Sequence, residues 1–412
     1  MNNIEKIILP ECIEKLVDFF PVDFYIVGGK VRSHLLNLDN DDIDLCSELK
    51  ISELEQVLKN SKYEIKFKNE TLGTAKIICG DKAYDYATLR KEVYRDGGYR
   101  QPEKVEFVKS IEEDYLRRDF TANAVYYSVK SGKFYDFCGG IEDIKNRVVR
   151  CVKNPNEVLK DDGVRILRMV RIACQLNFRI DKATFSAALK NIKNLENLSD
   201  VKVASEITKI CNSCFVGVCK KNAHIRGIKI LNKLKAWKHF GFSFSKLKIN
   251  MFKKNARYLG LLIDIVNCEN PASVSYFLDK VFDKLQINKK KKEEIINILS
   301  GYYDALNRIP NKIYFAKYFD NFEKIYELLI CKSKLIAQKY NFFYKYIISH
   351  KIVVRVADLK VSTRDLTKNF PSLPKKNHNV ILNMVLSDIF EGRYNNDKEV
   401  ILKEIEKKLK FY

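Results

Sequence analysis

The chain has 412 residues, of which 74 are Lys or Arg and 52 are Asp or Glu, so its formal net charge at pH 7 is +22. This length allows two or more domains, and the charge favours a polyanionic partner such as nucleic acid, although an AT-rich genome that inflates the lysine content would give the same excess. No apolar run is long enough to cross a bilayer, which argues against a membrane protein. The 11 cysteines are scattered and no secretory leader opens the chain, so we expect a reducing, cytoplasmic setting.

Apolar side chains recur at helical spacing over the first 20 residues, which predicts an N-terminal helix. Residues 24–27 are predicted to form a buried strand that ends at a pair of glycines, and a helix is expected over 31–36. Glycine lets the backbone of such a turn approach a phosphate, and an arginine in the helix can bind it with a charged fork. The candidate phosphate-binding residues are Gly28, Gly29 and Arg32.

Two carboxylates, Asp42 and Asp44, stand two positions apart at a strand predicted over residues 43–45. Alternate residues of a strand point to the same face, so both side chains are expected to aim side by side. Magnesium takes carboxylate and phosphate oxygens as ligands, which makes this pair a candidate Mg²⁺ site beside the glycine turn. The alternative is a solvated acidic loop.

Several further segments follow in a fixed order along the chain. They are Gly73-Thr74, residues 84–90 (YDYATLR), 112–124 (EEDYLRRDFTANA), 135–143 (YDFCGGIED) and 161–171 (DDGVRILRMVR). Together with the glycine turn and the paired carboxylates, they resemble the class II tRNA nucleotidyltransferase and bacterial poly(A) polymerase family, within the polymerase β-like superfamily. The resemblance covers about residues 20–210, and its most specific segment is 117–124.

The order of elements predicts an α+β protein. Strands and helices are mixed as far as about residue 150, and helical periodicity dominates almost to the end of the chain. The resemblance implies a polymerase β-like nucleotidyltransferase head over residues 1–150. We expect an all-α neck with base recognition to follow over 151–230, and an all-α body and tail that binds RNA over 231–412.

The resemblance implies a catalytic role for three acids of the head. Asp85 falls where the family keeps a third carboxylate, so with Asp42 and Asp44 it would complete the catalytic set. Such a set holds Mg²⁺ and lowers the pKa of the attacking hydroxyl. The alternative for Asp85 is an ordinary surface acid beside a strand.

Segment 117–124 carries the next group of candidates. Arg117 and Arg118 are placed to neutralise the triphosphate, and the resemblance favours Arg118. It also implies that Asn123 contacts the sugar. A structural alternative is that Asp119 pairs with one of the two arginines and fixes the turn.

The neck carries a candidate base-reading pair. Cytosine and adenine present an exocyclic amine beside a ring nitrogen, so a carboxylate with a guanidinium selects them over uracil and guanine. Asp162 and Arg165 stand three positions apart on a predicted helix, and the family uses this motif in that role. Arg168 and Arg171 continue the same row of side chains along the predicted helix and are expected to reach the triphosphate. The structural alternative for Asp162 and Arg165 is a salt bridge on a solvated helix face. Gly163, in the same predicted helix, indicates that a base or a backbone segment packs closely there.

The predicted helix begins at a good start signal, with Asn154 as N-cap and Pro155 in the first position. Beyond the neck, the helical half is basic and aromatic, as in 332–345, and phosphate contacts from such faces bind RNA without reading its sequence. The sequence does not predict the oligomeric state.

The predicted function is the addition of C, C and A to the 3′ end of tRNA without a template, from CTP and ATP, with release of pyrophosphate. The alternatives within the family are a poly(A) polymerase and a partial enzyme that adds only CC or only A. A non-catalytic RNA-binding protein is the alternative from another class, and the intact acidic set argues against it.

One cluster imitates a zinc knuckle through the spacing of Cys211, Cys214, Cys219 and His224. The surrounding residues 207–231 predict helices with buried cysteines instead. We therefore favour a structural role for this cluster.

Overall fold

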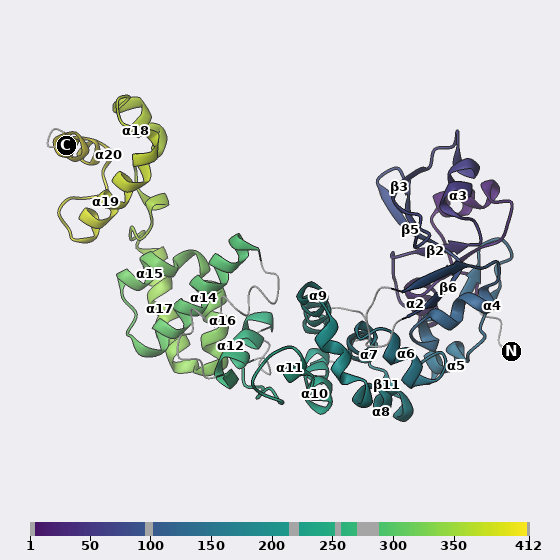
Figure 1. Ribbon diagram of the computed structural model, residues 1–412. Helices are drawn as coiled ribbons and strands as arrows, with labels where there is room; N and C mark the ends of the chain where they lie inside the picture. The colour runs from purple at the N-terminus through teal and green to yellow at the C-terminus, as the bar shows by residue number, and fades with distance from the viewer. Residues whose placement is uncertain (1–4, 95–101, 214–221, 252–256, 270–287, 410–412) are drawn as a thin grey trace. The chain divides into compact units, whose positions relative to one another are not determined.

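The computed structural model describes residues 5–94, 102–213, 222–251, 257–269 and 288–409. The chain divides into two compact units, the first comprising residues up to Lys248 and the second most of the described residues after it (Figure 1). All described strands precede Lys248, so the predicted α+β fold with a helical second half is confirmed. The three-part division at residues 150 and 230 stays a prediction. Among the described helices, none is both long and apolar enough to span a membrane.

A seven-stranded sheet forms the centre of the first unit, with its strands in the order β3-β4-β5-β2-β1-β8-β9. β1 (Phe24–Val27) has the predicted bounds and is largely buried. It pairs antiparallel with β2 and β8, whereas β2 and β5 are parallel. The other strands of this sheet are β2 (Asp44–Ser47), β3 (Glu64–Asn69), β4 (Thr74–Cys79), β5 (Lys82–Thr88), β8 (Tyr126–Ser128) and β9 (Phe134–Tyr135).

Two short strand pairs and a set of helices surround this sheet. The pairs are β6 (Arg90–Val93) with β7 (Lys104–Phe107), and β10 (Val148–Val149) with β11 (Arg179–Ile180). The helices are α1 (Glu11–Glu14), α2 (Gly29–Leu35), α3 (Ile51–Leu58), α4 (Ile111–Asp114), α5 (Gly140–Lys145), α6 (Pro155–Asp161), α7 (Val164–Gln175), α8 (Lys182–Lys190), α9 (Asp200–Cys211), α10 (Ala223–Leu234) and α11 (Ala236–His239). One apolar cluster ties β1, β2 and β8 to α4 and consists of Val27, Cys46, Leu89, Val108, Ile111 and Tyr126.

The N-terminal helix is shorter than predicted. Residues 5–10 have no regular structure, α1 begins at Glu11, and a 3₁₀ helix follows over Lys15–Phe19. Pro10 precedes the first helical residue. It lacks the N–H that a continuing helix needs and disfavours helical conformation in the residue before it, so the helix starts only after this proline.

The neck contains two helices where a single one is predicted. Asn154 caps α6 as expected, its side-chain oxygen accepting a hydrogen bond of 3.0 Å from the backbone N–H two residues later. α6 ends before Asp162, which has extended backbone (φ −145°, ψ 112°), and α7 starts after Gly163. A Cβ on Gly163 would lie 2.6 Å from the carbonyl oxygen of Asn194. The glycine therefore admits close-packed backbone, one of the two explanations that the sequence offers.

The second unit is helical throughout its described parts, as predicted. Its core is rich in aromatic side chains, and Tyr340, predicted on a basic RNA-binding face, is buried there. Phe342 of the same segment is 74% exposed. The helices of this half are α12 (Arg257–Glu269), α14 (Lys289–Asn307), α15 (Lys312–Tyr318), α16 (Phe322–Lys332), α17 (Lys334–Ser349), α18 (Thr363–Asn369), α19 (His378–Phe390) and α20 (Lys398–Leu409).

Candidate active site

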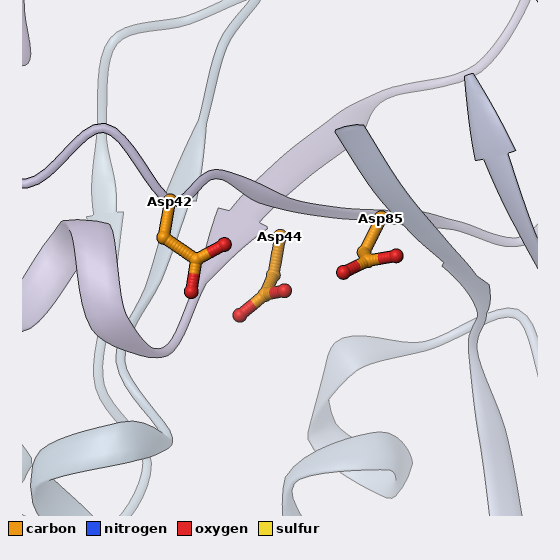
Figure 2. A group of neighbouring side chains, drawn as sticks. All are labelled: Asp42, Asp44 and Asp85. Atoms are coloured by element: carbon orange, nitrogen blue, oxygen red, sulfur yellow. The ribbon is translucent and has the colours of Figure 1, made fainter. Parts of the chain in front are cut away.

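Three carboxylates converge at one end of the central sheet. Because β2 and β5 are parallel, Asp44 lies directly opposite Asp85. Asp42 precedes β2, so the prediction that it shares a strand with Asp44 is wrong. The Asn40 side chain instead accepts a hydrogen bond of 3.0 Å from the Asp42 backbone N–H and turns the loop. One carboxylate oxygen from each of the three acids lies within 4.8 Å of the others (Figure 2).

The electrostatics of this acidic triad (Asp42, Asp44 and Asp85) suit a cation. Burial, together with the charges of the other two acids, raises the pKa of Asp44 to about 6. On β4, Lys76 forms a 2.6 Å ion pair with Asp85. Carboxylates that repel one another and lie within reach of one ion fit a hard divalent metal. Within the described ranges, no other group of three or more His, Cys, Asp or Glu ligand atoms converges in this way.

The glycine turn packs against the triad. Gly28 has a positive φ of 81°, and a Cβ there would lie 3.2 Å from an oxygen of Asp44. α2 starts at Gly29, two residues earlier than predicted, and presents Arg32 from its first turns. The Arg32 guanidinium donates to the side-chain oxygen of Asn123, while its buried Nε has no hydrogen-bond partner. Burial, with Arg171 and Arg168 nearby, lowers the pKa of Arg32 to about 10. An unsatisfied, buried cationic donor here suits an anionic ligand.

A cavity of about 810 Å³ opens beside this turn. Of the predicted site residues, all except Asp85 line it, so the head and neck candidates meet in one place within the first unit. The predicted residues that line it are Gly28, Gly29, Arg32, Asp42, Asp44, Arg118, Asn123, Asp162, Arg165, Arg168 and Arg171.

Arg117 and Arg118 are held by an acid that the sequence interpretation missed. Asp114 accepts hydrogen bonds from Arg117 Nε at 2.7 Å and from Arg118 Nη2 at 3.0 Å. The suggestion that Asp119 pairs with one of these two arginines is wrong. Asp119 instead accepts from Arg168 Nε at 2.6 Å and from Asn123 Nδ2 at 3.0 Å. Burial favours the neutral acid, yet the nearby arginines hold the pKa of Asp114 and of Asp119 below the usual range.

The base-reading pair does not share a helical face. Asp162 precedes α7, and its Oδ1 accepts a hydrogen bond of 2.8 Å from the Val164 backbone N–H. Arg165 lies in α7, is 5% exposed, and donates to the carbonyl oxygens of Val158 at 3.0 Å and Arg117 at 2.9 Å. Both side chains nevertheless line the cavity, so the predicted proximity holds although the predicted helix is wrong.

The two later arginines of the stripe have acidic partners. Arg168 is bound by Asp119, and Arg171 Nε donates to Glu206 of α9 at 2.7 Å. Glu206 was not predicted. A signal exists in the sequence, because Glu206 stands at helical spacing from the buried Val203 and Ile210, and a buried acid on an apolar face requires a partner.

The zinc-like cluster stays untested. Cys211 and His224 are buried in α9 and α10, whereas Cys214 and Cys219 lie outside the described residues.

Similarity to known proteins extends over most of the chain. Residues 24–150 match the family of the Poly A polymerase head domain. The chain is 29% identical over 407 residues to the CCA-adding enzyme of Ligilactobacillus salivarius, covering 93% of this chain and 92% of the relative. It is 35% identical over 187 residues to the CCA-adding enzyme of Enterococcus faecalis, covering 45% of this chain and 44% of that relative.

Solved structures share the fold. The Bacillus stearothermophilus CCA-adding enzyme in complex with CTP gives a TM-score of 0.69 at 18% identity, covering 97% of this chain and 98% of that one. The Thermotoga maritima CCA-adding enzyme complexed with tRNA gives a TM-score of 0.61 at 21% identity, covering 98% and 96%. At these identities the likeness is one of fold.

Proposed function

The chain belongs to the class II tRNA nucleotidyltransferase (CCA-adding enzyme) and bacterial poly(A) polymerase family, and we propose on this basis that it adds C, C and A to the 3′ end of tRNA. It takes CTP and ATP, uses no nucleic-acid template and releases pyrophosphate. The observation that carries this proposal is the acidic triad, which borders a cavity lined by the arginines of head and neck. A non-catalytic RNA-binding protein would have no use for this arrangement.

The metal that we propose is Mg²⁺, with Asp42 and Asp44 as its ligands and Asp85 as the third carboxylate of the set. When bound, a divalent ion neutralises phosphate charge and makes a hydroxyl a better nucleophile. The protein supplies positioning and further charge. Gly28 lets the backbone approach the phosphates, while Arg32 and Arg118 face the cavity as cationic donors.

We assign base selection to Asp162 and Arg165. The carboxylate of Asp162 is fixed by the N–H that it caps, and it accepts from the exocyclic amine of cytosine or adenine. Arg165 is fixed by two carbonyl oxygens and donates to the ring nitrogen. Uracil and guanine present a carbonyl where the amine should be, so they leave the buried acid unsatisfied.

The partner that we propose is tRNA, whose phosphates the basic helical half binds. The setting that we propose is the cytoplasm, where scattered thiols stay reduced.

The test is incorporation of labelled CTP and ATP, singly and together, into tRNA that lacks its CCA end and into a generic RNA. Addition of CCA that stops, confined to tRNA, supports the proposal. Runs of A on the generic RNA indicate a poly(A) polymerase, and addition of only CC or only A indicates a partial enzyme. No incorporation with Mg²⁺ present overturns the catalytic proposal.

A further inference from the structure

A buried acid outside the cavity organises the two arginines of segment 117–124. The Asp114 side chain is 0% exposed and does not line the cavity, yet it receives four hydrogen bonds. Besides those from Arg117 and Arg118, Tyr126 Oη donates at 2.6 Å and the Arg90 backbone N–H at 2.9 Å. A carboxylate with this many donors has no freedom to reorient, so its partners are fixed with it.

The geometry sets the direction of each arginine. Arg118 Nε donates to Tyr126 Oη at 2.7 Å, and its guanidinium lies 4.8 Å from the centre of the Tyr126 ring. Its Nε and one Nη2 hydrogen are thereby fixed, while the guanidinium still lines the cavity. Arg117 is held between Asp114 and Glu92, 3.6 Å away on β6. Two neighbouring guanidinium groups repel each other, and the two buried carboxylates offset that repulsion.

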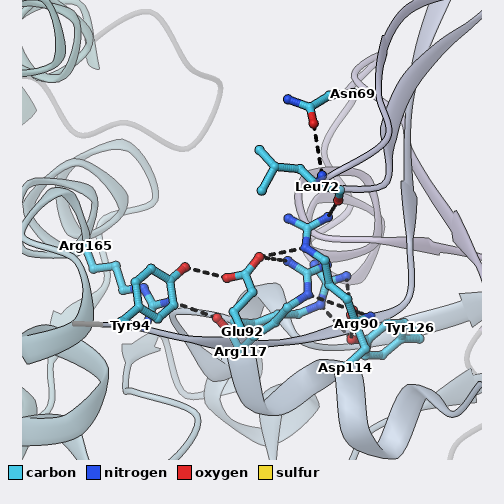
Figure 3. Close-up of polar contacts among 10 residues, drawn as sticks. Asn69, Leu72, Arg90, Glu92, Tyr94, Asp114, Arg117, Tyr126 and Arg165 are labelled. Carbon is cyan, nitrogen blue, oxygen red and sulfur yellow. Dashed lines mark hydrogen bonds and ion pairs between the residues drawn. The ribbon is translucent and has the colours of Figure 1, made fainter. Parts of the chain in front are cut away.

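The same network reaches the neck. Glu92 accepts from Arg90 Nε at 2.7 Å and from the Tyr94 hydroxyl, and the Tyr94 ring lies 5.3 Å from the Arg165 guanidinium. Figure 3 shows Arg165 and Tyr94 at one end of this network and Asp114 with Tyr126 at the other. Contacts inside the network therefore connect the phosphate-facing arginines with the arginine assigned to base reading.

We propose that Asp114 is a positioning residue, which aims Arg117 and Arg118 at the triphosphate of the incoming nucleotide. This inference rests on the proposed function. Asp114 does not line the cavity and acts through the two guanidinium groups. In D114N, the amide turns an N–H toward two cations and removes the charge that keeps them side by side, so both lose their orientation toward the phosphates.

The test compares D114N with D143N in the full-length protein. Asp143 is a matched control, because it is 5% exposed and bonds Thr121 Oγ1 at 2.7 Å and Arg150 Nε at 3.0 Å, but neither it nor Arg150 lines the cavity. We expect both variants to lower Tm. Only D114N should raise KM for ATP, by about tenfold or more, with a smaller change in kcat.

A second readout isolates the phosphate contacts. Binding of ATP and of inorganic tripolyphosphate is measured by equilibrium dialysis, and D114N should weaken both by similar factors, because the arginines contact phosphate and not base. Unchanged KM and unchanged Kd in a D114N protein that merely loses Tm as D143N does would overturn the assignment. If D114N does not fold, Y126F decides, because it removes one donor to Asp114 and one acceptor from Arg118. A KM for ATP raised about threefold supports the proposal, and an unchanged KM overturns it.

These experiments distinguish failure of the proposed function from failure of the role assigned to Asp114. A wild-type protein that binds tripolyphosphate, more tightly than D114N does, but incorporates no nucleotide overturns the proposed function and leaves the assignment of Asp114 standing. A wild-type protein that completes CCA, with D114N unimpaired in nucleotide binding, does the reverse.

Discussion

Asp44 on β2 lies directly opposite Asp85 on β5, so the parallel pairing of two strands makes neighbours of two acids that α3, β3 and β4 separate in the sequence. Neighbouring strands lie about 4.8 Å apart, which leaves two such carboxylates little room to avoid each other. Burial, together with repulsion from Asp42 and Asp85, raises the pKa of Asp44. The sheet thus holds carboxylates close together although they repel each other, and a bound cation would reduce that repulsion.

The first prediction concerns the pH dependence of metal-free stability. The pKa of Asp44 rises from 3.8 to about 6 on folding, so between these values the folded state binds more protons than the unfolded state. Stability contributed by this group therefore falls as pH rises through that window. D44N removes the titration, and its gain in Tm over the wild type, measured without metal, should be larger at pH 7 than at pH 4. An equal gain at both pH values would show that Asp44 does not titrate there.

The second prediction concerns the ion pair between Lys76 and Asp85. The Lys76 ammonium neutralises the Asp85 carboxylate and so competes with a metal ion for it. K76M should therefore lower the divalent-metal concentration needed for half-maximal activity, by about two- to fivefold. K68M is the matched control, because Lys68 lies on the adjacent strand β3 and pairs at 2.7 Å with Glu55 of α3, outside the triad. A metal requirement that rises in K76M, or shifts equally in K68M, contradicts the prediction.

The third prediction isolates the approach of Gly28 to the triad. Gly28 and Gly80 both have positive φ, 81° and 60°, so alanine at either position costs about 1–2 kcal/mol of stability or more. Only at position 28 does the added Cβ meet a neighbour, an oxygen of Asp44 at 3.2 Å. Chemical denaturation should therefore find a loss in both variants and a larger one in G28A, because Gly28 combines its positive φ with a ψ of −126°, which only glycine adopts readily. Incorporation assays should find an activity loss of about tenfold or more in G28A alone. Equal activities would mean that the turn contributes only backbone conformation.

The parts of the site that the sequence predicted correctly depend on local patterns. The apolar run of β1 followed by Gly28 and Gly29 is contiguous, so its strand and turn follow from residues that stand side by side. The paired acids are equally local, although Asp42 reaches the site from a loop and not from the strand. Asp85 required the family resemblance, because nothing near it in the sequence distinguishes it from a surface acid.

The incorrect predictions depend on contacts between distant segments. The helix was expected to run through Gly163, but its break accommodates the backbone of Asn194 on a later segment. The partner of Asp119 is Arg168, 49 positions away, rather than either adjacent arginine. Proximity in sequence therefore does not identify the partner of Asp119, since the fold brings a distant arginine to it.

The last prediction tests base selection through Asp162. D162A removes the acceptor for the exocyclic amine of cytosine and adenine, so discrimination against UTP and GTP should fall. A lost recognition of this kind is worth about 1–3 kcal/mol, or roughly 5- to 150-fold in the ratio of kcat/KM for CTP to that for UTP. The measurement is single-nucleotide addition to tRNA lacking its CCA end, with each triphosphate supplied alone.

D162A also removes the cap of α7, so its control must lose a cap without touching the cavity. Asp181 meets this need, because it accepts from the Thr184 backbone N–H at 3.1 Å at the start of α8 and does not line the cavity. Each alanine costs about 1 kcal/mol of helix capping. D181A should therefore match D162A in stability and match the wild type in selectivity. If D162A keeps the wild-type preference for CTP over UTP, Asp162 is a helix cap alone, and Arg165 and its neighbours must select the base without it.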